Sequence, residues 1–452
     1  MKFLLVKPMP PKESINLQSF MICEPLELEY VAAYLERAGH QAEIVDLVID
    51  GSFQKAFTKD RYDAVAFTSY LIHVGVVRRY AEYVKRKSPQ TLTMVGGVHA
   101  EVVPQDFESP HIDLILSGGM YALEALLPLL ESRAPLKELR RAAATPKRTV
   151  FDFPHPDRTK TAKYRSRYNY IYHDACATIK TSFSCAYDCE FCFCTRVGKY
   201  FERDLEDVAD ELQEIRERNV FIVDDDFLFR RERLIEFCRL LDERNIRKTF
   251  IAFGRADFIA ENEDIVALLQ DHGFDAFFVG IESFKKEELS DYNKRTSVEI
   301  NEKAVRILEK HGVQCYSGLI VGYDWTKQDF DGLINYLNSF EHPMVNVQPI
   351  TPIKGTPFYE KAKDRIVEDE KNYPYFDMAH CVMMPENLSP RAFYYHILRT
   401  YLKTSASAKG RKYVRERYGK KIYRRVRKGA FTIAMQYVRL ILKPNIGRKT
   451  HE

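Results

Sequence analysis

The sequence predicts an α/β protein in which an N-terminal doubly wound parallel sheet is followed by a partial (β/α)6 barrel and a small basic helical region. Three observations support this prediction. Short apolar runs alternate with helical segments over the first 130 residues, and six more such runs follow a break near residue 133. The last part of the chain lacks this alternation and is rich in lysine and arginine.

The composition is that of an ordinary globular protein. The chain has 452 residues, of which 45% are hydrophobic and 29% charged, enough for two or three domains. Its start, "MKFLLVKPMPP", has an apolar stretch too short for a signal sequence or a membrane span. We therefore expect a cytoplasmic, reducing location, in which the nine cysteines serve as thiols or metal ligands and not as disulfides.

The first 135 residues are expected to form one domain with strands at 2–7, 42–47, 64–69, 91–97 and 113–119. A helix from about Leu28 to Gly39 follows the first strand, because apolar residues recur there at helical spacing. Ligands of doubly wound sheets bind beyond the carboxyl ends of the strands. The residues that fall there are Ser69, Gly96, Gly97, His99, Gly118 and Gly119.

Residues 136–174 are rich in proline, arginine and tyrosine and are predicted to form a linker that packs in places. Residues 175–365 resume the alternation, with strands expected at 176–182, 220–224, 248–253, 275–281, 314–321 and 344–350. Six strand–helix units fit a partial barrel with its chemistry at the carboxyl ends of the strands. Residues 366–452 are expected to form the helical basic region.

The segment "SFSCAYDCEFCFC", residues 182–194, follows the first of these barrel strands. It places Cys185, Cys189 and Cys192 at C-x3-C-x2-C spacing, with Cys194 two residues further on. Structural zinc usually has four ligands in two separated pairs, and no second pair is present. Burial as small apolar side chains is the other ordinary interpretation. A 4Fe–4S cluster held by three cysteines would leave one iron open to a further ligand.

The motif C-x3-C-x-Phe-C, here with Phe191, resembles the cluster motif of the radical S-adenosylmethionine (SAM) superfamily. The whole arrangement resembles the subgroup with an N-terminal cobalamin-binding domain, over about residues 1–365. Further matching stretches are "MVGGVHAEVVP", "IVDDDF", "VGIES", "LSDYNKRTSVEINEKAVRILEKHGV" and "PITPIKGTPFYE". The resemblance implies that Cys185, Cys189 and Cys192 ligate a 4Fe–4S cluster and that SAM binds the open iron.

The resemblance also implies the residues that hold SAM. Phe191 is expected against the adenine, Arg255 at the carboxylate and Glu282 at the ribose. The run Asp224, Asp225 and Asp226 follows the second barrel strand, where relatives contact the SAM amino group. Two structural alternatives stay open: the aspartates cap a helix, or Arg255 and Glu282 form an ion pair. Cys194 is expected to be a bystander.

For the N-terminal domain, the resemblance implies a cobalamin site formed by Ser69, Leu71, Gly96, Gly97, His99 and Gly118. The loop after the first strand, "KPMPPKES", lacks the histidine that ligates cobalt in other cobalamin-binding domains. We therefore expect cobalamin to be bound without a protein histidine on cobalt. The sequence Gly118-Gly119-Met120-Tyr121 departs from the G-E-G-E usual in relatives, which leaves binding of cobalamin itself open.

The function implied by the resemblance is a radical SAM enzyme, namely a cobalamin-dependent methyltransferase acting on an unactivated carbon or phosphorus centre. One alternative is radical cyclisation, rearrangement or oxidation without methyl transfer, with or without cobalamin. The non-enzymatic alternative is an electron-transfer protein that carries the cluster. The expected partners are a small-molecule or lipid-like substrate and an electron donor such as flavodoxin or ferredoxin.

The C-terminal tail differs from the rest of the chain in charge. Residues 409–452 contain fifteen lysines and arginines against two glutamates, a net charge of +13. The whole chain carries +4, so the other residues carry −9. Because residues 430–442 are apolar, we expect a helix packed on the barrel with its apolar face inward, ahead of a helix on a membrane surface. Nucleic-acid binding is not expected from so apolar a segment.

Overall fold

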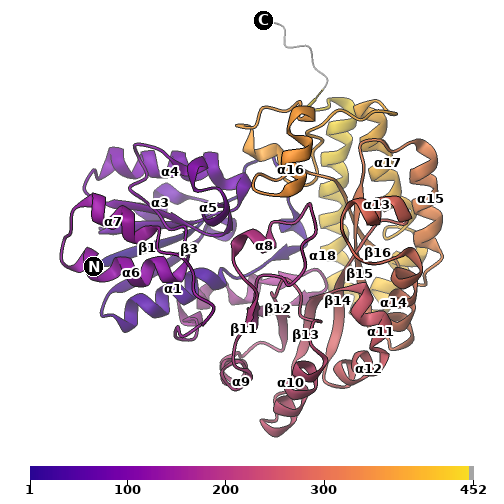
Figure 1. Ribbon diagram of the computed structural model, residues 1–452, viewed down its shortest axis with the longest axis horizontal. Coiled ribbons are helices and arrows are strands. Elements are labelled where there is room, and N and C mark those ends of the chain that lie inside the picture. Colours follow the sequence, from indigo (N-terminus) through magenta and orange to yellow (C-terminus); the bar gives the residue numbers. More distant parts are fainter. Residues whose placement is uncertain (447–452) are drawn as a thin grey trace, which may run out of the picture.

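A computed structural model describes residues 1–446 and shows an N-terminal α/β domain beside an open barrel (Figure 1). The N-terminal sheet is parallel throughout, with strand order β3-β1-β4-β5-β6. Its strands are β1 (Lys2–Lys7), β3 (Gln41–Asp46), β4 (Ala64–Thr68), β5 (Leu92–Gly96) and β6 (Leu114–Ile115). The predicted doubly wound sheet is confirmed.

Helices cover both faces of this sheet because successive side chains of a strand point to opposite faces. Phe3 and Leu5 of β1 belong to one buried cluster, whereas Leu4 and Val6 belong to another. The longer helices of the domain are α1 (Leu26–Arg37), α4 (Val74–Lys87) and α6 (Met120–Glu131). The shorter ones are α2 (Leu47–Asp50), α3 (Phe53–Phe57) and α5 (Val98–Val102).

Residues 136–174 connect the two domains and pack against both. They contain α7 (Leu136–Ala143), a 3-10 helix (Arg158–Arg167) and the short strands β7 (Asn169–Tyr170) and β8 (His173–Asp174). β7 also pairs with β2 (Met21–Ile22) of the N-terminal domain. Tyr164 and Tyr168 are fully buried, and Arg158 donates to Glu211 Oε1 of the barrel domain at 2.7 Å.

The ion pairs of His155 in this segment predict a pH dependence of stability. Its ring nitrogens lie 3.1 Å from Asp207 Oδ1 and 3.0 Å from Glu214 Oε1, and the hydrogen bond to Asp207 is the main reason that its pKa rises to about 9. Protonated His155 stabilises the folded state fully below its ordinary pKa of 6.5, and this contribution is lost as pH rises through about 9. Between pH 6.5 and about 9, we expect the melting temperature of His155→Gln to fall less than that of wild type. An equal fall in wild type and variant would contradict this prediction.

The second sheet is the predicted partial barrel, with strand order β16-β15-β14-β13-β12-β9 and all pairs parallel. Its strands are β9 (Cys176–Ile179), β12 (Asn219–Ile222), β13 (Thr249–Gly254), β14 (Phe274–Glu282), β15 (Gln314–Val321) and β16 (Met344–Pro349). All six predicted strands are therefore present. A small antiparallel hairpin, β10 (Ser182–Phe183) with β11 (Phe201–Glu202), flanks the cysteine segment.

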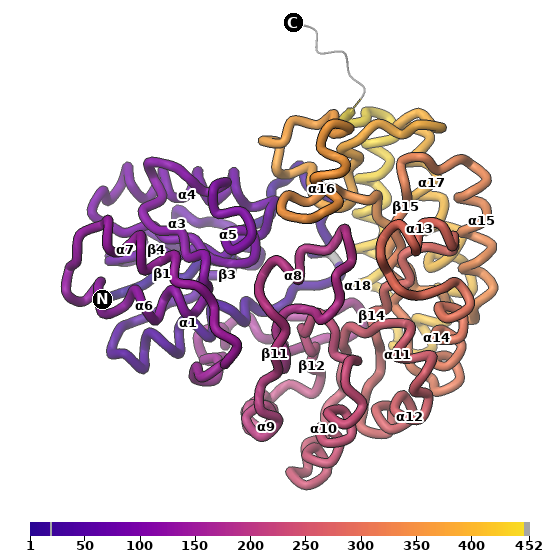
Figure 2. Tube along the Cα trace, in the orientation of Figure 1, coloured from indigo at the N-terminus to yellow at the C-terminus, as the bar shows by residue number. Residues whose placement is uncertain are grey.

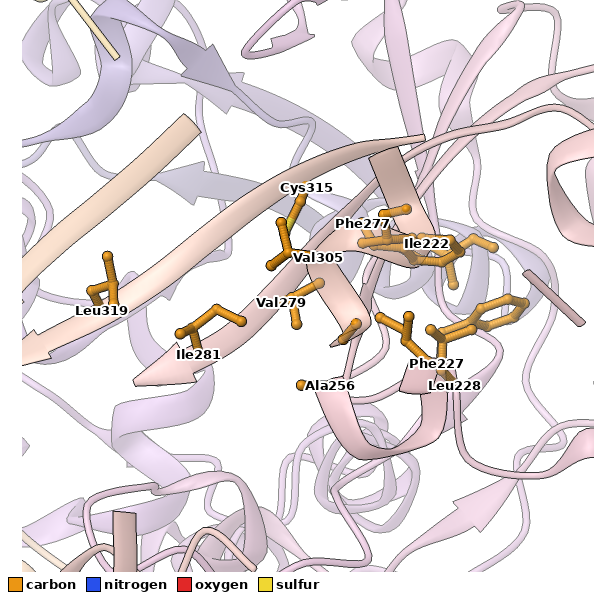
Figure 3. Packing of buried hydrophobic residues seen from close by; sticks show 14 of the residues in the cluster. Ile222, Phe227, Leu228, Ala256, Phe277, Val279, Ile281, Val305, Cys315 and Leu319 are labelled. Atoms are coloured by element: carbon orange, nitrogen blue, oxygen red, sulfur yellow. The ribbon is translucent and has the colours of Figure 1, made fainter. Parts of the chain in front are cut away.

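Helices pack on the outer face of the barrel sheet. The longer ones are α9 (Leu205–Glu214), α10 (Arg231–Glu243), α12 (Glu263–Asp271), α14 (Val298–Lys310) and α15 (Lys327–Asn338). Shorter helices of the barrel domain are α8 (Cys194–Val197), α11 (Ala256–Glu261), α13 (Lys286–Asp291) and α16 (Pro357–Ala362), of which α8 lies against α5 of the N-terminal domain. Figure 3 shows the core between these layers, in which Phe277, Val279 and Ile281 of β14 belong to the same buried cluster as Val305 of α14. Phe278 and Gly280 alternate with them, so their side of β14 faces the barrel interior.

Two helices end the described chain, α17 (Pro390–Lys403) and α18 (Ala408–Leu442), which lie side by side along the barrel (Figures 1 and 2). α18 is interrupted at Gly419, whose φ of 83° is left-handed. Tyr437 and Leu440 are buried, and Arg425 donates to the carbonyls of Phe20 and Ile171. The predicted packing of the basic tail on the barrel is confirmed; residues 447–452 of that tail lie outside the described part. No helix within residues 1–446 is both long and apolar enough to cross a bilayer.

Candidate functional site

The cysteine segment lies at the carboxyl ends of the barrel strands. Cys185, Cys189 and Cys192 line one cavity of about 250 Å³ together with residues of β13, β14, β15 and β16. The loop is fixed from within: Ser184 adopts a left-handed φ of 62°, and its hydroxyl donates to the carbonyls of Cys194 and Gly198 at 3.0 and 2.7 Å. A backbone hydrogen bond from Cys192 N to Cys189 O, 3.1 Å long, closes the turn between two of the thiols.

The three thiols suit an iron–sulfur cluster, because soft thiolates are its usual ligands. Burial raises the pKa of Cys185 to about 12 and raises that of Cys189 as well, so binding of a cluster must release protons. Within residues 1–446, no three His, Cys, Asp or Glu side chains stand close enough together to hold a single metal ion. Cys194 lines the same cavity, with its Sγ 3.4 Å from Asp225 Oδ1.

The three predicted aspartates do not share one role. Asp224 is buried and accepts hydrogen bonds from Thr181 N and from the hydroxyls of Thr181 and Ser182, at 2.5 to 2.8 Å, and it does not line the cavity. Asp225 and Asp226 do line it. The alternative that this run caps a helix is wrong, because α10 begins at Arg231 and its capping residue is Arg230.

Asp226 is the aspartate with free acceptors. Neither carboxylate oxygen has a hydrogen-bond partner in the described part of the chain, and both are buried. Burial raises the pKa of Asp226 to about 8, although the nearby positive charges of Arg255 and Lys294 act to lower it. An unpartnered buried carboxylate beside three thiols is suited to a cationic group such as the amino group of SAM.

Arg255 and Glu282 both line the cavity but do not pair with each other, so the alternative of an ion pair between them is wrong. Arg255 donates to both carboxylate oxygens of Asp257 and, at 2.7 Å, to the carbonyl of Lys294. Its guanidinium carbon lies 3.7 Å from the centre of the Tyr187 ring. Glu282, at a left-handed φ of 59°, accepts from Lys294 Nζ at 2.7 Å.

Lys294, Tyr187 and Asp257 are site residues that the sequence interpretation missed. Lys294 is buried with its ammonium group in the cavity wall, and it lies within the stretch "DYNKRT", which could have drawn attention to it. Tyr187 lies inside the cysteine motif itself. Phe191 lines the cavity, and its ring packs edge-on against Tyr292 with centroids 5.6 Å apart.

The contrast between two aspartates gives a test. We expect Asp226→Asn to weaken SAM binding to the cluster-loaded protein at least tenfold, since a hydrogen bond to a charged group is worth about 1.5–3 kcal/mol. Asp224→Asn is the matched control, because it should lower the melting temperature and leave the affinity for SAM close to that of wild type. Equilibrium dialysis with labelled SAM measures the affinity of each variant for SAM. Equal affinity in Asp226→Asn and wild type would remove Asp226 from the site.

A second, larger cavity of about 930 Å³ lies between the N-terminal domain, the barrel and the C-terminal helices. Of the predicted cobalamin residues, Leu71 and His99 line it. Ser69 lies behind this wall and donates from its hydroxyl to the carbonyl of Gly96 at 2.8 Å. The carboxyl ends of β4 and β5 thus form one end of the cavity, as expected for a doubly wound sheet.

The three glycines predicted at the cobalamin site differ in whether a side chain would fit at their position. A Cβ at Gly96 would meet only Leu116 Cβ, at 3.8 Å, so this position keeps a space open. Gly97 has a φ of 92°, and a Cβ there would lie 2.6 Å from Ser69 N. At Gly118 a Cβ would lie 1.7 Å from Thr145 O, so the close approach of residues 136–174 explains this glycine.

Two histidines line this cavity, His73 and His99, and they differ in how their ring nitrogens are used. His99 Nε2 lies 2.9 Å from Asp106 Oδ2. His73 Nδ1 accepts from Tyr70 N at 3.2 Å, while its Nε2 is buried without a partner in the described residues. Burial lowers the pKa of His73 to about 4, so its ring is neutral at physiological pH. The open space at Gly96 and the absence of a histidine in residues 7–14 fit cobalamin bound without a protein ligand on cobalt.

The two cavities adjoin. Five residues line both of them, and all lie at or beyond the carboxyl ends of the barrel strands or on the inner face of those strands: Phe278, Asn346, Gln348, Ile353 and Met378. A molecule held at this shared wall is within reach of a group bound at the cysteines and of a group bound over β4 and β5. The arrangement is therefore suited to a reaction that uses two cofactors on one substrate.

Comparison with known proteins identifies both domains. Residues 179–337 match the family model of the radical SAM superfamily, and residues 15–127 match that of the B12 binding domain. The chain is 29% identical to hopanoid C-3 methylase of Methylococcus capsulatus, over 88% of this chain and 79% of the relative. It is 24% identical to anaerobic magnesium-protoporphyrin IX monomethyl ester cyclase of Cereibacter sphaeroides, over 81% of this chain and 64% of the relative.

Among solved structures, the fold resembles that of OxsB, a cobalamin-dependent SAM radical enzyme solved with aqua-cobalamin and SAM bound. The TM-score is 0.70 at 16% identity, and the match covers 98% of this chain and 73% of OxsB. Fold, domain order and the family matches agree with the residues of both cavities. The chain therefore carries a radical SAM domain after an N-terminal B12-binding domain, and these domains make it an enzyme whose cofactors are a 4Fe–4S cluster, SAM and cobalamin.

Proposed function

We propose that this enzyme transfers a methyl group to an unactivated carbon of its substrate. The observation that carries the proposal is the wall shared by the two cavities, which allows one carbon to face both cofactor sites. The similarity to a hopanoid C-3 methylase over most of both chains supports methyl transfer to carbon. When bound, the cluster and SAM supply a 5′-deoxyadenosyl radical, and cobalamin supplies the methyl group.

In this proposal, the residues of the chain bind and orient the cluster and SAM. Cys185, Cys189 and Cys192 hold the cluster, and Asp226 accepts from the amino group of SAM. Arg255, held by Asp257, presents a fixed positive charge that we assign to the SAM carboxylate. Glu282, held by Lys294, is assigned to the ribose, and Phe191 to the adenine.

The barrel also protects the reaction. The wall around the cluster is formed largely by apolar or backbone atoms of strand residues such as Phe253, Gly254, Gly318 and Leu319. Such a wall excludes water, which would otherwise compete for reactive groups. We assign the electron donor to a small redox protein such as flavodoxin or ferredoxin, since reductive cleavage of SAM needs one electron.

Product masses test the proposal. With SAM carrying a trideuterated methyl group, we expect a product heavier by one labelled methyl group, together with S-adenosylhomocysteine and 5′-deoxyadenosine. The similarity to a magnesium-protoporphyrin cyclase favours an oxidative cyclisation as the second candidate function. That reaction would give a product that has lost hydrogen, with 5′-deoxyadenosine but no S-adenosylhomocysteine. If 5′-deoxyadenosine fails to form with any substrate, the protein would instead be a cluster-carrying electron-transfer protein.

A further inference from the structure

We infer that the part of the 930 Å³ cavity along α17 and α18 binds an elongated, largely hydrocarbon molecule, which is the substrate. This inference rests on the proposed function, because it names the class of molecule whose carbon is methylated. The N-terminal end of the cavity, over β4 and β5, belongs to cobalamin. The remainder is walled by the C-terminal helices and extends away from that end.

The wall formed by α18 is a single continuous face. Eight residues of α18 after the Gly419 break line the cavity: Tyr423, Val426, Arg427, Ala430, Phe431, Ile433, Ala434 and Tyr437. All but Arg427 and Phe431 recur at intervals of three or four and lie in one row along the helix. At 1.5 Å per residue, the row from Tyr423 to Tyr437 is about 20 Å long. The cavity is therefore a long channel along the helix. Ala430 and Ala434 leave room at its middle because their side chains are short.

The rest of this part of the cavity has the same character. Of the other lining residues, Leu398 and Tyr401 of α17 lie beside α18, and Tyr172 of the connecting segment with Tyr316 and Met344 of the barrel complete this apolar part of the cavity. The hydroxyl of Tyr401 is already hydrogen-bonded within the protein, because it donates to Val347 O at 3.0 Å. A polar substrate group placed here would lose its hydration and find few hydrogen-bond partners in return. Burial of apolar substrate surface, in contrast, contributes about 25 cal/mol of favourable free energy per Å².

The charged residues that line the cavity are Lys7, Glu24, Glu27, Lys354, Asp377, Arg411 and Arg427. Lys7 pairs with Asp46 at 3.1 Å on the side of the N-terminal domain. Arg427 lines the cavity and is exposed, and its neighbour Phe431 is 68% exposed, so the channel reaches the surface beside these two residues. A hydrocarbon molecule with a polar group at one end would place that group at Arg427 and its other end at the wall shared with the cluster cavity.

Binding of a probe tests the inference without turnover. The protein is loaded anaerobically with cluster and cobalamin, and binding of tritiated retinol, an elongated isoprenoid alcohol, is measured by equilibrium dialysis. We expect Ala434→Trp to weaken retinol binding at least tenfold, because the indole fills the middle of the channel. Thr432→Trp, on the exposed side of the same helix, is the matched control and should bind retinol as wild type does.

Three results would overturn the inference: no retinol binding to wild type, equal binding by Ala434→Trp, or equal weakening by both tryptophan variants. Iron, cobalamin content and 5′-deoxyadenosine formation are measured in the same preparations. Loss of methyl transfer with retinol binding intact would contradict the proposed function and not the substrate channel. Methyl transfer to a polar substrate without retinol binding would contradict the channel and not the function.

Discussion

Replacing Cys185, Cys189 and Cys192 together by alanine is expected to lower the iron content of the reconstituted protein from about four atoms per chain to none. The three thiols line one cavity and belong to one loop, so no other donor set within the described residues replaces them. With dithionite and SAM, the variant should form no 5′-deoxyadenosine. Iron and acid-labile sulfide analysis, with chromatography of the nucleoside products, measures both effects.

Cys194→Ala is the control for this prediction. Cys194 lines the same cavity, but the three-cysteine motif is complete without it, so this variant should keep its cluster and its activity. Tightly bound zinc without labile sulfide in the wild type would show that the thiols serve a different metal. Loss of the cluster in Cys194→Ala would show that the fourth cysteine is also a ligand.

Gly96→Val is expected to abolish cobalamin uptake and leave the cluster intact. The space beside Gly96 holds only Leu116 Cβ at 3.8 Å, so valine can be accommodated by the fold while it fills the volume expected for the nucleotide tail of cobalamin. The two sites lie on separate domains, which is why iron content should not change. Absorbance of bound cobalamin after gel filtration measures the loss.

Gly97→Val provides the comparison. A Cβ at Gly97 would lie 2.6 Å from a backbone nitrogen, and the φ of 92° at this position disfavours any side chain. This variant should therefore have a lower melting temperature than wild type and should also fail to take up cobalamin. Gly96→Val should keep a melting temperature near that of wild type. Full cobalamin uptake by Gly96→Val would place the nucleotide tail elsewhere.

The regular parts of the fold were predictable because their signals are local. The run Gln314–Val321, mostly apolar in sequence, is buried at every position, as is typical of an inner strand of a parallel sheet covered on both faces. The cysteine loop was predictable because three cysteines lie within eight residues. Its place after β9, at the carboxyl ends of the strands, followed from the alternation of strands and helices.

The pairing of charged residues was not predictable, because it depends on contacts between distant segments. Asp224, Asp225 and Asp226 are adjacent in sequence, yet Asp224 turns to Thr181 while Asp226 faces the cavity. Glu282 pairs with Lys294, which lies beyond a helix and a turn. The apolar channel could likewise not be predicted from the sequence, because its walls come from three regions that only the tertiary fold brings together.

The most direct test of the account is the electron paramagnetic resonance spectrum of cob(II)alamin bound to the protein, recorded with the cluster oxidised and then reduced. Adjoining cavities predict that the reduced cluster broadens or splits the cobalt signal. The contact of His99 with Asp106 and the histidine-free loop after β1 predict no nitrogen superhyperfine splitting from an axial ligand. Splitting would point to His73, which lines the cavity with an unpartnered Nε2. A cobalt signal unchanged by cluster reduction, or one split by an axial nitrogen, would contradict the account.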